Sequence, residues 1–142
     1  SEANIIPVPV DKHGLNIEAG LERAKNFKLA FVTPAHQQPM GVSMSLERRL
    51  GLIDAAIKAN GFILEDDYDG EFRYDGHPLP ALKSIDQAQR VIYVGSFSKT
   101  LMPALRIGFL IVHRFCARYS LKQYESTLKV FLQIYNNFWR QR

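Results

Sequence analysis

The sequence predicts an α/β fold with a mainly parallel sheet, and three observations support this prediction. Four short apolar runs have strand character, at residues 29–33, 61–66, 91–96 and 107–112. Each run is continuous rather than alternating, which is typical of strands that are buried on both faces of a sheet. A helical pattern lies between the first two runs, and a strand, a helix and a strand in that order form a βαβ unit.

The helix between the first two strands has clear start and stop signals. Ser45 is placed to cap its N-terminus, and Asn60 followed by Gly61 supplies a stop. Four apolar residues recur at spacings of 4, 3 and 4 and therefore share one side of the helix: Leu46, Leu50, Ile53 and Ile57. We expect this side to be buried against the sheet.

The rest of the chain divides into an irregular connection and a distinct C-terminal stretch. Residues 72–90 contain Gly76, Pro78 and Pro80, and they predict a loop with one helical turn. Residues 113–142 carry aromatic and leucine residues in rough helical spacing. We therefore expect an α/β segment over 1–112, followed by a basic, helical stretch over 113–142.

The charge of the chain is unevenly distributed. The formal net charge is +4, but residues 1–112 hold 12 Lys and Arg against 13 Asp and Glu, whereas residues 113–142 hold 6 against 1. The basic surplus therefore belongs to the C-terminal stretch, and such a run is usually a solvated helix face. We do not expect this chain to bind nucleic acid.

Composition indicates a soluble globular segment, with 46% hydrophobic and 23% charged residues. The single cysteine, Cys116, rules out an internal disulfide framework and suits a small apolar filler better than a zinc ligand. No apolar stretch approaches the roughly 20 residues of a membrane span, and the N-terminus has no signal-peptide pattern. We expect no membrane contact and a reducing, cytoplasmic setting.

Candidate site residues follow two neighbouring predicted strands. Lys99 comes just after the third strand, and the acidic cluster at 65–69 comes at the end of the second. In open α/β sheets ligands bind at the carboxyl ends of the strands. A lysine, a carboxylate and a tyrosine at this edge form the arrangement that holds a pyridoxal phosphate ring, because a partly desolvated lysine can form an imine with the cofactor's aldehyde. The alternative is an ordinary surface lysine.

The acidic cluster could serve the ring in two ways. Asp66 or Asp67 could keep the pyridine nitrogen protonated, and Tyr68 could donate a hydrogen bond to the ring's phenolate oxygen. A metal site, a magnesium-phosphate site or a solvated turn are the alternatives. A calcium loop beginning at Glu65 is rejected, since its twelfth position would be Gly76 and the cluster follows a strand. We expect no metal.

Donors for a phosphate group and a further polar amide are also present. Ser96, Ser98 and Arg106 lie in one strand-turn-strand stretch, and a guanidinium offers a bidentate fork to an anion. Arg106 could equally be a surface arginine. The turn after the first strand, residues 36–41, holds an amide that could reach the ring oxygen, although its proline and glycine could simply shape the turn.

Several motifs, in this order, resemble one known family. They are Thr33-Pro34-Ala35-His36-Gln37 with Pro39 and Gly41, the acidic motif from Glu65 to Tyr74, Ser96-Phe97-Ser98-Lys99, and Leu105-Arg106-Ile107-Gly108. The chain resembles fold-type-I pyridoxal-phosphate enzymes, and the acidic motif is most similar to the aminotransferase-like domain of MocR-type regulators in the GntR family. The resemblance implies a partial three-layer α/β/α large domain of the PLP-dependent transferase, aspartate aminotransferase-like, fold over 1–112.

The resemblance also implies roles for individual residues. Lys99 would be the catalytic, imine-forming lysine, Asp66 the partner of the pyridine nitrogen, and Tyr68 the donor to the ring hydroxyl. The phosphate ligands would be Ser96, Ser98 and Arg106. Gln38 stands where aminotransferases of this class usually have asparagine, one methylene shorter.

Two functions follow from this resemblance as expectations. The first is the cofactor-sensing or effector-sensing part of a MocR-type regulator, and the alternative is part of a catalytic aminotransferase acting on amino acids and 2-oxo acids. A degraded fragment without activity is a third interpretation. The expected partners are an amino acid or amine, a second copy in the intact homodimer, and DNA only through a module absent from this chain. The family's large domain begins before Ser1, so we expect this chain alone to be too incomplete for turnover.

Overall fold

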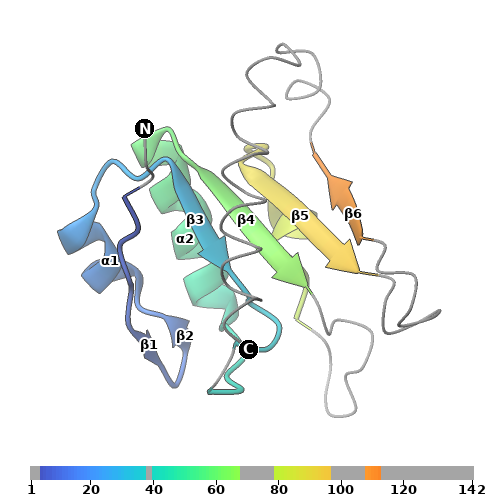
Figure 1. Ribbon diagram of the computed structural model, residues 1–142, viewed down its shortest axis with the longest axis horizontal. Coiled ribbons are helices and arrows are strands. Elements are labelled where there is room, and N and C mark those ends of the chain that lie inside the picture. The colour runs from blue at the N-terminus through green and yellow to red at the C-terminus, as the bar shows by residue number, and fades with distance from the viewer. Residues whose placement is uncertain (1–3, 38–39, 68–78, 97–107, 113–142) are drawn as a thin grey trace. The chain divides into compact units, whose positions relative to one another are not determined.

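The computed structural model describes residues 4–37, 40–67, 79–96 and 108–112, and Ile6–Ile111 belong to one compact unit (Figure 1). Its elements in chain order are β1 (Val10–Asp11), β2 (Gly14–Leu15), α1 (Ile17–Arg23), β3 (Leu29–Val32), α2 (Leu46–Ala59), β4 (Phe62–Asp67), α3 (Leu82–Ile85), β5 (Val91–Ser96) and β6 (Gly108–Ile111).

The four predicted strands form one sheet in the order β3-β4-β5-β6. The strands β3, β4 and β5 are parallel, and β6 pairs antiparallel to β5. The prediction of a mainly parallel sheet is confirmed, and every predicted strand boundary is within one residue of the observed one. Strand β4 has neighbours on both sides, which explains why four consecutive residues of it are buried.

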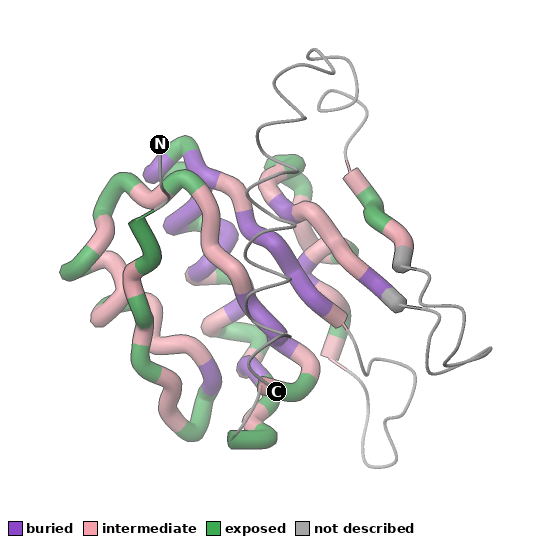
Figure 2. The backbone as a smooth tube through the Cα atoms, viewed as in Figure 1, coloured by how far each residue is buried: buried purple, intermediate pink, exposed green. Residues whose placement is uncertain are grey.

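Burial on both faces, which the continuous apolar runs predicted, does not extend to the edges of this sheet. In β3 only Val32 is buried, and in β6 Leu110 and Ile111 are exposed (Figure 2). Both strands have a hydrogen-bonded neighbour on one side only within the part of the chain that is described. The apolar runs therefore identified strands correctly but could not separate central strands from edge strands.

The helices α2 and α3 lie on the same face of the sheet (Figure 1). The core between them and the sheet is made of Val32, Met44, Leu52, Ile53, Ala56, Ile63, Leu82 and Val91. The described residues therefore form two of the three expected layers, namely the sheet and one layer of helices.

Helix α2 begins and ends as predicted. The Ser45 hydroxyl accepts a hydrogen bond from the Arg48 backbone N–H at 3.3 Å, and Asn60 adopts a left-handed conformation with φ 49°. An asparagine tolerates this conformation better than most residues, so the helix stops there.

The predicted buried side of α2 is wrong for three of its four residues. Ile53 is buried, but Leu46, Leu50 and Ile57 are 42%, 52% and 44% exposed. The buried residues of α2 are Arg49, Leu52, Ile53, Ala55, Ala56 and Ala59, of which Leu52, Ile53 and Ala56 belong to the core. Three of the six buried positions are alanines, so Leu46, Leu50 and Ile57 do not lie on the buried face of the helix.

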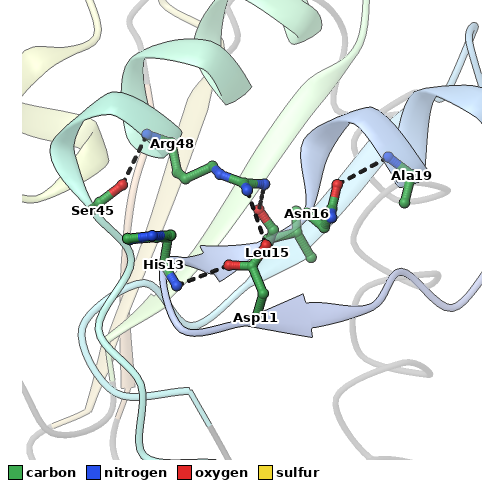
Figure 3. A network of polar contacts seen from close by, with 7 residues as sticks. All are labelled: Asp11, His13, Leu15, Asn16, Ala19, Ser45 and Arg48. Carbon is green, nitrogen blue, oxygen red and sulfur yellow. Dashed lines mark hydrogen bonds and ion pairs between the residues drawn. The ribbon is translucent and has the colours of Figure 1, made fainter.

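An N-terminal hairpin and helix, which the sequence reasoning did not identify, are attached to the start of α2. Arg48 forms an ion pair with Asp11 at 2.9 Å and donates to the carbonyl of Leu15 at 3.0 Å (Figure 3). Gly14 has φ +100° and lies against Met44, so a side chain would not fit there. The sequence does hold a signal for α1, which is the asparagine at its N-cap position. The side chain of Asn16 accepts a hydrogen bond from the Ala19 N–H at 3.1 Å.

The connection before β5 contains one short helix, α3, as the proline-containing segment predicted. Lys83 donates to the carbonyl of Val91 at 2.6 Å, and Asp86 accepts from the Val91 N–H at 2.7 Å, which ties α3 to the start of β5. The expectations for 113–142, including Cys116, lie outside the described residues. No helix in the described ranges is long and apolar enough to cross a membrane.

Candidate functional site

Three parallel strands end at one edge of the sheet, where the sequence predicted the site. Strand β4 ends at Asp67 and β5 at Ser96, with the Cα of Asp67 paired to that of Gly95. Strand β3 ends at Val32, which pairs with Glu65, and continues into the loop of residues 33–44. The backbone therefore brings the start of the loop after β3, the acidic residues 65–67 and the end of β5 to the same edge.

Asp66 is a buried carboxyl group with an unsatisfied oxygen. Its side chain is 4% exposed, and its Oδ2 has no hydrogen-bond partner among the described residues. Burial and, to a lesser extent, the neighbouring charge of Asp67 together raise the pKa of Asp66 from its ordinary value of 3.8 to about 6. A buried acceptor without a donor is costly, so this position suits a ligand that brings an N–H group.

Asp67 has a partner that Asp66 lacks. The hydroxyl of Tyr93 on β5 donates to Asp67 Oδ2 at 2.8 Å, while Asp67 Oδ1 is buried without a partner in the described structure. Successive residues of a strand point to opposite faces, so Asp66 lies on the face opposite Asp67 and Glu65. Of the two carboxylates that the sequence left open, Asp66 is thus the one without a protein donor in the described ranges.

Glu65 is committed to the protein's own backbone. Its two oxygens accept from the N–H groups of Leu82 and Lys83, each at 2.8 Å, at the start of α3. Burial raises the pKa of Glu65, and these two hydrogen bonds and the charge of Arg49 oppose that effect. Within the residues that the structure describes, no group of three or more His, Cys, Asp or Glu side chains could hold a metal ion.

The loop after β3 is closed by its own backbone. Gln37 and Val42 form an isolated antiparallel bridge, and Gly41 turns the chain with φ +67°. The side-chain oxygen of Gln37 is buried and has no hydrogen-bond partner in the described part of the chain. Sequence reasoning assigned the neighbouring Gln38 and passed over Gln37, although two consecutive glutamines in a turn gave a signal for both.

A close contact fixes the end of β5 against β6. The ring of Phe109 lies over Gly95, where a Cβ atom would overlap it, and the same ring lies 6.0 Å from that of Tyr93. Only glycine leaves room for this ring, so Gly95 has a packing role that the sequence analysis did not identify.

Most of the predicted site residues lie outside the described residues: Gln38, Tyr68, Ser98, Lys99 and Arg106. Ser96 is described as the last residue of β5, with its Cα paired to Gly108, but nothing is described of its side chain. Asp66 is therefore the one predicted ligand whose side-chain surroundings are described. The roles of all seven residues stay predictions.

The class of protein follows from a comparison with solved structures. The kynurenine aminotransferase of Pyrococcus horikoshii, solved in complex with PMP, is 38% identical, and it matches 74% of this chain and 28% of its own with a TM-score of 0.70. The chain has the α/β fold of fold-type-I pyridoxal-phosphate-dependent aminotransferases, as the motifs predicted. No protein-family model matches the chain.

The chain is homologous to MocR-type regulators of the GntR family as well as to aminotransferases. YdeL, an uncharacterized HTH-type transcriptional regulator of Bacillus subtilis, is 50% identical over 109 residues, which are 77% of this chain and 23% of YdeL. The probable rhizopine catabolism regulatory protein MocR of Rhizobium meliloti is 44% identical over 110 residues, which are 78% of this chain and 22% of that protein. The chain spans less than a quarter of the length of both regulators.

Proposed function

We propose that this chain is a pyridoxal-phosphate-binding segment of an aminotransferase-like domain that senses a cofactor or effector in a MocR-type transcriptional regulator. The observation that carries the proposal is the buried carboxyl group of Asp66, whose Oδ2 has no donor among the described residues. The similarity to two regulators at 50% and 44% identity supports the choice of a regulator.

Asp66 fits the pyridine nitrogen of the cofactor on chemical grounds. A protonated ring nitrogen brings one N–H donor and one positive charge, and Asp66 at the end of β4 needs both. The bound cofactor supplies an electron sink for reactions at an amino-bearing carbon. The carboxylate of Asp66 would hold the ring and maintain the charge on its nitrogen, through a hydrogen bond strengthened by the two opposite charges.

The other proposed ligands are taken from the motifs. Lys99 would present its amine to the cofactor's aldehyde, and the hydroxyl of Tyr68 and the amide of Gln38 would donate to the ring oxygen. A phosphate group would be bound by Ser96, Ser98 and Arg106, since hydroxyl and guanidinium groups are effective phosphate donors.

The alternative function is that of a segment of a catalytic aminotransferase acting on amino acids and 2-oxo acids. The 38% identity to a solved aminotransferase favours this alternative. The Nζ atom of Lys99 would then also take up the proton from the α carbon of the substrate. A transamination assay on the intact protein separates the two functions, because a pure sensor releases no 2-oxo acid.

The same proposal extends to partners and location. The ligand recognised together with the cofactor would be an amino acid or another amine, and the intact protein would be a homodimer. Contact with DNA would be made by a separate module of the regulator. We propose a cytoplasmic location, which a sequence with a single cysteine supports.

Reductive labelling tests the proposal directly. The chain is incubated with pyridoxal phosphate, reduced with borohydride, digested and analysed by mass spectrometry. We expect the label on Lys99 and its loss in Lys99→Ala, whereas Lys58→Ala, which removes an exposed lysine of α2, should leave the labelling intact. Labelling spread evenly over the lysines would contradict the proposal.

A further inference from the structure

Arg49 is a buried cation that holds two separate stretches of backbone. The side chain is 1% exposed and belongs to the first turn of α2. Its Nε donates to the carbonyl of Met44 at 2.9 Å, and its two terminal nitrogens donate to the carbonyls of Pro34 and Pro80, each at 2.8 Å. The planar guanidinium thereby joins the loop after β3 to the segment before α3.

Glu65 binds the start of α3, which directly follows the segment that Arg49 binds. Its carboxylate accepts from the N–H groups of Leu82 and Lys83, two and three residues after the proline whose carbonyl binds Arg49. The short stretch 80–83 is therefore bound through a carbonyl to a cation and through two amides to an anion. We refer to Arg49, Glu65 and these hydrogen bonds as the Arg49–Glu65 clamp.

This arrangement is not the most stabilising choice for the fold. A positive charge in the first turn of a helix opposes the helix dipole, and burying two charged groups carries a desolvation cost that apolar residues of the same size avoid. Leucine or methionine would suit the buried face of α2, which already contains Leu52 and Ile53. What the charged pair adds is a fixed geometry for the backbone that it binds.

The residues of the clamp and the residues that they bind are close in sequence to three proposed ligands. Pro34 and Met44 are the two ends of the loop that contains Gln38. Pro80 follows, in the sequence, the acidic motif that contains Tyr68. Glu65 directly precedes Asp66 in β4.

We infer that Arg49 and Glu65 are positioning residues, which set the placement of Asp66 relative to Pro34, Met44 and the stretch 80–83 that they bind. This inference rests on the proposed function. It requires arginine at residue 49, because a guanidinium binds several carbonyls with a rigid fork, whereas a lysine ammonium has no fork to hold them in a fixed relation.

The test compares two substitutions in α2 on the 142-residue chain. Arg49→Lys keeps the charge but not the fork, and the control Ile53→Val trims a buried residue one turn further along α2 without removing any hydrogen bond of the clamp. We expect Arg49→Lys to raise the dissociation constant for pyridoxal phosphate about tenfold, the scale seen when a supporting hydrogen bond around a site is lost. The control should bind with unchanged affinity.

A second readout does not depend on the cofactor. Carbon-13 NMR of the labelled Asp66 carboxyl group follows its protonation against pH in each variant. Arg49→Lys should move the Asp66 titration, and Ile53→Val should not, because only the first substitution removes hydrogen bonds to Pro34, Met44 and Pro80. If Arg49→Lys does not fold, Glu65→Gln replaces it in both measurements, since it removes the other half of the clamp with little change in volume.

The outcomes separate the two proposals. A wild-type chain that does not bind pyridoxal phosphate overturns the proposed function, and the Asp66 titration then decides the role of the clamp. If the wild-type chain, the clamp variants and the control all bind pyridoxal phosphate equally well, the inference about the clamp is overturned and the proposed function is not. An Asp66 titration that is identical in all variants also overturns it.

Discussion

Replacing Asp66 by asparagine should stabilise the cofactor-free chain at neutral pH. The reason is that Asp66 is buried, has an oxygen without a donor among the described residues, and has its pKa raised from 3.8 to about 6. Each unit of pKa difference corresponds to about 1.36 kcal/mol, so the ionised carboxylate costs the folded chain about 3 kcal/mol at pH 7. Asparagine keeps the shape of the side chain and removes the charge.

The sign of the pH dependence follows from proton binding. Between pH 3.8 and about 6 the folded chain holds a proton on Asp66 that the unfolded chain has lost. The free energy of unfolding therefore falls as the pH rises through this range, and it stays lowered above it. The advantage of Asp66→Asn should be small near pH 4 and reach about 3 kcal/mol at pH 7.

Urea unfolding of both chains at several pH values measures this difference, because subtracting the two curves cancels the groups that they share. Asp54→Asn is the matched control. Asp54 is exposed on α2 and forms an ion pair with Lys58 at 2.6 Å. Such an exposed pair contributes only about 0.3–0.5 kcal/mol, so the control should show little dependence on pH over this range.

Two results would refute the reasoning about Asp66. One is a difference between wild type and Asp66→Asn that does not change between pH 4 and pH 7. The other is a wild-type chain that is more stable than the variant at pH 7, which would mean that the buried carboxylate has a donor in the cofactor-free protein.

Two further substitutions test local features of the fold. Gly95→Ala should destabilise the chain by about 1–3 kcal/mol in thermal unfolding, because the added methyl group overlaps the ring of Phe109. The double variant with Phe109→Leu should recover part of the loss, and no recovery would contradict the packing explanation. Ser45→Ala should lower the free energy of unfolding by about 1 kcal/mol in urea, because it removes the cap of α2. Ser45→Asn should keep most of that stability, because asparagine is also a good N-cap residue. Equal stability of the wild type and both Ser45 variants would show that the cap contributes nothing.

The sequence predicted those features of the fold that depend on neighbouring residues. The four sheet strands were identified because continuous β-branched and aromatic runs favour extended backbone. The cap at Ser45 and the stop at Asn60 were identified because both act through hydrogen bonds within a few residues of the chain. The hairpin at 10–15 and helix α1 were missed, since they are short and their stability comes largely from contacts with α2, including the ion pair of Arg48.

The choice of Asp66 could be predicted only through the motif, because two adjacent aspartates look equivalent in a sequence. The structure distinguishes them through their environments: the hydroxyl of Tyr93, on another strand, binds Asp67, and Asp66 lies on the opposite face. Arg49 could not be identified at all, because its partners at Pro34 and Pro80 are 15 and 31 residues away.

The amino-acid order by itself determined the strands, the ends of α2, the family resemblance and the candidate ligands, because these depend on local propensity and on short motifs. Only the tertiary structure decided which side of α2 meets the sheet, which carboxylate is left without a protein donor in the described ranges, and that an arginine joins the two loops. The physical reason is that burial and hydrogen-bond satisfaction depend on residues that are distant in the sequence.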